Sequence, residues 1–102
     1  MVWRGEIEKH YENVDKTYAV LDLIDNDQIT AKNELREVIR RELQLSCECI
    51  IDWLDDSNNE NSRKSKRYLE SLELGYDICV VLEVRTFIYQ LLDKSFSDLI
   101  NS

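Results

Sequence analysis

The chain has 102 residues, of which 21 are Asp or Glu and 13 are Lys or Arg, so its formal net charge is −8. It contains no proline and only two glycines, the residues that interrupt helices most strongly. An apolar fraction of 43% excludes a disordered chain, and the length leaves room for one domain, residues 1–102. These properties predict an all-α fold: a small antiparallel bundle of three long helices plus a short C-terminal helix.

The first predicted helix spans about residues 3–25. Its apolar side chains recur at intervals of three and four residues, the spacing of one face of an α-helix. They are Ile7, Tyr11, Val14, Tyr18 and Leu21. Asp25, Asn26 and Asp27 then predict a turn, because their side chains compete for backbone hydrogen bonds.

A second helix is predicted over residues 30–56, opening at Thr30, whose hydroxyl can cap free amides of the first turn. The polar stretch 57–62 predicts the next turn. A third helix is predicted over residues 62–92, and a short terminal helix contains Phe96, Leu99 and Ile100.

Two alternatives stay open for the third helix. A bend or break at Gly75 is one, because glycine costs about 1 kcal/mol relative to alanine inside a helix. A buried strand over residues 78–82 is the other, because that stretch is apolar and β-branched. Helix is favoured over strand, since no second strand candidate exists to pair with it.

Apolar residues cover more than one side of this third helix, and such a helix is usually buried on several sides. Two other long helices leave part of that surface uncovered, which predicts a homo-oligomer. The residues assigned to the seam are Val80, Val84, Phe87, Ile88 and Leu91. A fourth helix folding back from Ser95 is the alternative cover.

The excess negative charge belongs to the first two predicted helices. Residues 1–31 and 32–61 each carry −4, whereas residues 62–102 are neutral. An acidic surface attracts basic partners and repels nucleic-acid phosphates, so the expected partner is a basic protein surface, and direct nucleic-acid binding is not expected. The predicted contacts are Glu8, Glu12, Asp15, Asp22 and Asp25, with Asp52, Asp55 and Asp56 as a second patch.

The one basic run is residues 62–67, Ser-Arg-Lys-Ser-Lys-Arg, just across the second turn from Asp52, Asp55, Asp56 and Glu60. An antiparallel hairpin is expected to pair these opposite charges. Such pairing would offset the unfavourable position of both clusters relative to the helix dipoles. Contact with a phosphate backbone and docking of a protein are the alternatives for this run.

Signals for catalysis are weak. His10 is the only histidine and has no nucleophile at a fixed spacing, so it is not expected to act as a general base. Cys47 and Cys49 lie on nearly opposite faces of a helix and cannot share a metal. With Cys79, they are expected to be small buried side chains in a reducing compartment. Neither an enzyme nor a bound cofactor or metal is expected.

The sequence therefore predicts a small acidic protein that masks or inhibits a basic, nucleic-acid-processing partner, as immunity proteins, antitoxins and phage-encoded inhibitors do. The alternative is an oligomeric scaffold or accessory subunit that assembles through the third helix. No stretch approaches the ~18 apolar residues of a membrane span, and the first residues lack the apolar core of a secretory signal. The expected location is therefore cytoplasmic.

Overall fold

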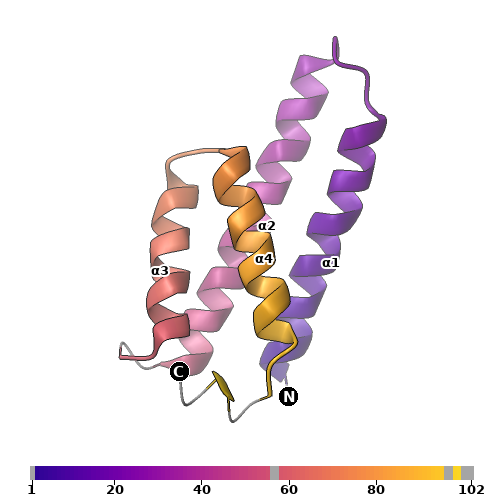
Figure 1. Ribbon diagram of the computed structural model, residues 1–102. Helices are drawn as coiled ribbons and strands as arrows, with labels where there is room; N and C mark the ends of the chain where they lie inside the picture. The colour runs from indigo at the N-terminus through magenta and orange to yellow at the C-terminus, as the bar shows by residue number, and fades with distance from the viewer. Residues whose placement is uncertain (1, 56–57, 96–97, 100–102) are drawn as a thin grey trace.

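The computed structural model describes residues 2–55, 58–95 and 98–99. That part of the chain forms four α-helices: α1 (Val2–Leu23), α2 (Ile29–Leu54), α3 (Glu60–Glu73) and α4 (Ile78–Leu92). Successive helices run in opposite directions along the bundle, and α1 and α2 project beyond the turn that joins α3 to α4 (Figure 1). The predicted all-α bundle is confirmed. None of the described helices is long and apolar enough to cross a membrane.

The two hairpins of the bundle differ in length. The 26 residues of α2 correspond to about 39 Å of helix, and the 15 residues of α4 to about 22 Å. A 3.0 Å hydrogen bond from the Gln28 amide to the Asp25 carbonyl closes the predicted turn after α1. The prediction that Thr30 caps the second helix is wrong, because α2 begins at Ile29 and its N-cap residue, Gln28, makes no side-chain capping bond.

The segment predicted as one helix over residues 62–92 is two helices, because the chain reverses direction at Gly75. This glycine has a φ of 129°, a conformation that residues with a side chain rarely adopt. Asp77 then caps α4 by accepting a 2.9 Å hydrogen bond from the Cys79 amide. Residues 78–82, the alternative strand, form the first residues of α4. Of the alternatives for this segment, the break at Gly75 is correct.

The core lies in the part of the bundle where all four helices pack side by side (Figure 1). Its buried apolar side chains are Ile7, Val14 and Leu21 of α1, Ile39, Leu43, Cys47 and Ile50 of α2, Leu72 of α3, Val81, Val84, Phe87, Ile88 and Leu91 of α4, and Leu99. The buried side chains of α3 are mostly small and polar. Ser65, for example, is fully buried and donates a 2.8 Å hydrogen bond to the Asn61 carbonyl of its own helix. A hydroxyl satisfied in this way can be buried without a partner on another helix.

The predicted self-association seam lies inside the single chain. Val84, Phe87, Ile88 and Leu91 are at most 8% exposed, and Val80 packs partly buried against the same core. Helix α4 reaches this position because the break at Gly75 turns it back along α3 and beside α1 (Figure 1). The side of α4 that carries these residues is therefore covered within one chain, and their assignment to a seam between chains is wrong.

Leu99 is held against the N-terminal end of α3. Leu99 is fully buried, and the Asn59 side-chain amide donates a 2.8 Å hydrogen bond to its carbonyl. The carboxamide oxygen of Asn59 also caps α3 by accepting from the amides of Asn61 and Ser62. The other residues named for the predicted terminal helix, Phe96 and Ile100, lie outside the described residues.

Candidate functional site

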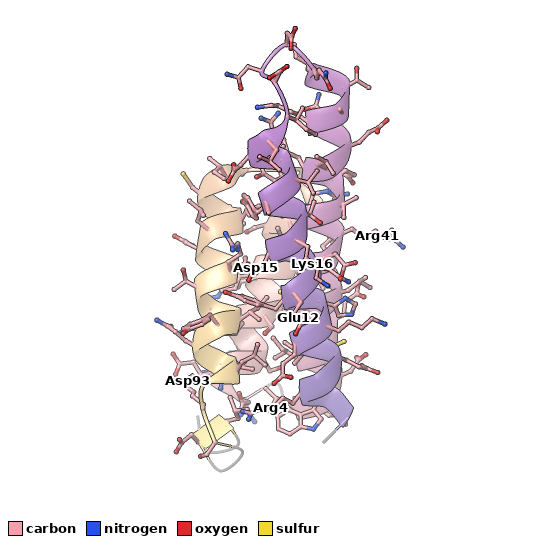
Figure 2. The ribbon with its side chains drawn as sticks, turned by 90° about the vertical axis from the view of Figure 1, so that its right-hand side faces the viewer. Arg4, Glu12, Asp15, Lys16, Arg41 and Asp93 are labelled. Carbon is pink, nitrogen blue, oxygen red and sulfur yellow. The ribbon has the colours of Figure 1, made fainter. Side chains whose placement is uncertain are left out.

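Most of the acidic contacts predicted on α1 lie on its flank facing α4. Glu8, Asp15 and Asp22 follow one another at seven-residue intervals, so they leave the helix in nearly the same direction. That direction is toward α4, because Asp15 pairs with Arg85 of α4. Figure 2 shows Asp15 on the side of α1 nearer α4. Glu12 comes between Glu8 and Asp15 in the sequence and lies on the side of α1 that faces the viewer in Figure 2. We call Glu8, Glu12, Asp15 and Asp22 the acidic row, which extends about 21 Å along α1.

Three members of the acidic row carry free charge. Glu8, Glu12 and Asp22 are exposed, and within the described parts of the chain no base lies within ion-pair distance of them. Asp15 differs because its carboxylate is paired with the Arg85 guanidinium. A carboxylate neutralised within its own chain adds little attraction for a partner, so the attraction of the row for a basic partner comes mainly from Glu8, Glu12 and Asp22.

Aromatic side chains and Arg85 hold α1 against α4 beneath the row. The guanidinium carbon of Arg85 lies 4.4 Å from the centroid of the Tyr18 ring, a cation–π contact. The ring centroids of Tyr11 and Tyr89 are 6.2 Å apart, and the hydroxyls of Tyr18 and Tyr76 are 3.2 Å apart. Burial, followed by the hydrogen bond to Tyr76, raises the pKa of Tyr18, so this phenol stays neutral. These contacts fix the acidic row relative to α4.

Exposed apolar side chains of α4 lie next to the acidic row. Leu82 and Tyr89 are 48% and 62% exposed. With Tyr11, Arg85 and Thr86 they line a hollow of about 180 Å³ between α1 and α4. Protein interfaces commonly combine an apolar centre with a charged rim. Leu82 and Tyr89 were not predicted as contacts. Their seven-residue spacing places them on one side of α4, but only the packing of the helices shows that this side is exposed.

The remaining predicted contacts do not join this surface. Asp25 lies in the turn between α1 and α2, at one end of the molecule, whereas Asp52 and Asp55 lie at the other end, where α2 finishes (Figure 1). All three are exposed, and none pairs with a described base. Asp55 also terminates α2 with a left-handed backbone conformation, φ 42°. Asp56 lies outside the described residues.

Two acids that were not predicted as contacts, Glu6 and Glu48, lie with Asp52 around Cys49 between α1 and α2. The Cys49 thiol donates to the Glu6 carboxylate across 3.6 Å. Burial raises the pKa of this thiol to about 11, with further contributions from Glu6, Asp52 and Glu48. Glu6 and Glu48 are 42 positions apart, so only the packing of α1 on α2 brings them to one place.

Within the described residues, the basic run pairs with an acid of its own helix and not with Asp52 or Asp55 across the turn. Its serines at positions 62 and 65 are buried, and its basic side chains stay outside the core. Lys64 pairs with Glu60 of the same helix at 3.5 Å, and Arg63 donates to a backbone carbonyl. The expected pairing is therefore confirmed for Glu60 and wrong for Asp52 and Asp55, which form no ion pair with the run in the described structure. Asp56 lies outside the described residues. The run therefore gives α3 a basic outer surface, on the opposite side of the bundle from α1 (Figure 1).

The residues considered above for catalysis or metal binding are His10 and the three cysteines. His10 Nδ1 lies 2.5 Å from Glu42 Oε2 and joins α1 to α2. Cys47 is fully buried, and burial raises its pKa to about 12. Cys79 is exposed, so the expectation that all the cysteines are buried is wrong for this residue. The described residues contain no group of three or more His, Cys, Asp or Glu side chains that could hold a metal ion.

Comparison of the chain with protein-family models, curated proteins and solved structures gives no match. Function must therefore be inferred from the chemistry of the surfaces themselves. Among them, the face formed by α1 and α4 combines unpaired charge with exposed apolar area.

Proposed function

We propose that this protein binds a basic surface of another protein through the face formed by α1 and α4, and masks that surface. The observation that carries the proposal is that one face holds the exposed carboxylates of Glu8 and Glu12 on α1 and the exposed side chains of Leu82 and Tyr89 on α4. Tyr11 of α1 lines the same hollow as these two α4 side chains. Rim charges steer a partner of opposite sign and speed its approach, while a central aromatic side chain supplies affinity.

A protein partner fits this face better than a small molecule does. The hollow beside Leu82 has a volume of about 180 Å³, below the ~300–1,000 Å³ of ordinary ligand pockets. The net charge of −8 opposes binding to phosphates and favours a partner whose own site receives phosphates. Proteins that process nucleic acid are therefore the first candidates, and their masking would be a form of inhibition.

The test uses two charge-reversal variants with the same change in net charge. Glu8→Lys combined with Glu12→Lys alters the acidic row, and Asp15 is left in place because its reversal would break the pair with Arg85. Glu70→Lys combined with Glu73→Lys alters exposed positions of α3 and serves as the control. Each pair of substitutions takes the formal charge from −8 to −4, since each Glu→Lys change adds two.

The wild type and both variants are used as baits at low salt, in extract from the cells that make the protein. Wild type and control should capture the same basic protein, and the Glu8/Glu12 variant should lose most of it. With that partner purified, Tyr89→Ala should weaken binding by about 2 kcal/mol, roughly 30-fold, mainly through faster dissociation. Equal capture by both variants, or capture of acidic proteins alone, would contradict the proposal.

A further inference from the structure

A groove of about 950 Å³ opens at the end of the bundle where α1 and α2 project past the α3–α4 turn (Figure 1). Apolar side chains in its lining are Leu21, Leu23, Ile24 and Ile78, together with the rings of Tyr18 and Tyr76. Leu23 is 85% exposed and Ile78 is 48% exposed. The shorter α3–α4 hairpin therefore leaves a step whose apolar surface is open on one side.

The charges in this groove are divided by sign. Asp22 and Asp25 come from the end of α1 and the turn after it, and Lys32 and Arg36 come from α2. None of the four forms an ion pair within the described structure, although all line one groove. Lys32 and Arg36 instead hydrogen-bond to neutral asparagine side chains, at 2.7 and 3.0 Å. A complementary occupant presents bases to the acidic side, acids to the basic side, and apolar surface between them.

We propose that this occupant is a second copy of the same chain, in a symmetric dimer. In a two-fold interface one patch meets itself, so the acidic side of each groove can face the basic side of the other. The projecting α1–α2 hairpin of each copy would then fill the step beside the α3–α4 turn of its partner. This arrangement pairs Asp22 and Asp25 with Lys32 and Arg36 between copies and covers Leu23.

The dimer is independent of the function proposed above. Glu8, Glu12 and Tyr89 do not line the groove, so the α1–α4 face stays available for a different protein. Asp22 is the one member of the acidic row that the dimer would use. Loss of the dimer and loss of partner binding are therefore separable by substitution.

The decisive experiment is a charge swap followed by mixing. One variant carries Asp22→Lys and Asp25→Lys, and the other carries Lys32→Glu and Arg36→Glu, so that each groove has a single sign of charge. Sedimentation over a concentration series up to about 1 mM, the weak limit of specific association, should show a dimer for wild type and a monomer for each variant alone. The two variants mixed in equal amounts should form a heterodimer, because every charge then meets its opposite.

A second pair of variants tests the apolar part. Leu23→Asp should abolish the wild-type dimer, whereas Tyr89→Asp, a matched control about 16 Å farther along α4 from Ile78, should not. Circular dichroism of each variant is the control, and it should show unchanged helix content. A wild type that stays monomeric throughout, mixed variants that stay apart, or a dimer lost in Tyr89→Asp but kept in Leu23→Asp would each overturn the proposal.

Discussion

Replacing either glycine by alanine is the same chemical change, and we expect opposite effects on stability at the two positions. Gly75 has a φ of 129°, and no heavy atom lies within 4 Å of the position that a Cβ would take. The cost of Gly75→Ala is therefore conformational and not steric. Strained backbone of this kind costs roughly 1–3 kcal/mol, and the reduced entropy of the unfolded chain returns about 0.4–1 kcal/mol. A net loss of about 1–2 kcal/mol in the free energy of unfolding is expected.

Gly5 provides the matched control. It lies within α1, and its Cβ position is also free of contacts within 4 Å. Alanine is better than glycine in a helix by about 0.5–1 kcal/mol, so Gly5→Ala should stabilise the protein by up to that amount.

Urea unfolding followed by circular dichroism measures both free energies, and Tm should move by about 4–8 °C for each kcal/mol. The result that would refute the reasoning is a stabilising Gly75→Ala substitution. It would mean that residue 75 is helical and that residues 62–92 form one continuous helix.

Three further outcomes are expected. Ile88→Ala should cost about 2–4 kcal/mol in urea unfolding, because this side chain is fully buried within one chain; a cost below ~1 kcal/mol would contradict that burial. At neutral pH a thiol reagent should react rapidly with Cys79 alone, since raised pKa values keep Cys47 and Cys49 protonated; Cys79→Ser should remove the fast phase. The pKa of Cys47 rises on folding from 9.0 to about 12, so the protonated thiol contributes fully to the free energy of unfolding below about pH 9. That contribution is lost as the pH rises toward 12. The free energy of unfolding should therefore fall less steeply over this pH range in Cys47→Ala than in the wild type.

The helices were predictable from the sequence where the signal is local. The seven-residue recurrence of Ile7, Val14 and Leu21 marks the buried side of α1, and the aspartates at 25 and 27 mark its end. Such local patterns could not establish the break at Gly75, because sequence with the apolar pattern of a helix continues on both sides of it. A glycine costs a helix only about 1 kcal/mol, which tertiary packing can offset. The prediction of a seam on α4 failed because residues 62–92 were taken as one helix. The predicted bundle then had too few helices to cover the apolar side chains of this segment.

The candidate site was predictable in its charge but not in its pairing. Counting acids along the chain located the free carboxylates of Glu8 and Glu12 correctly as exposed groups. The pairing of Asp15 with Arg85 spans 70 positions, so it depends on which helices become neighbours. The exposure of Leu82 and Tyr89 depends on the same packing, because an apolar stripe in the sequence does not reveal which side of a helix the other helices cover.

The central claim is that free carboxylates beside an exposed apolar stripe dock a basic partner. Its most direct test is the rate of association with the purified partner as a function of salt. For wild type the rate should fall steeply as the screening length drops from ~10 Å at 0.1 M to ~3 Å at 1 M. The variant with Glu8→Lys and Glu12→Lys should associate more slowly at low salt, with a shallower dependence, and approach the wild-type rate at high salt. Identical rates and salt dependence for the folded variant and wild type would contradict the claim.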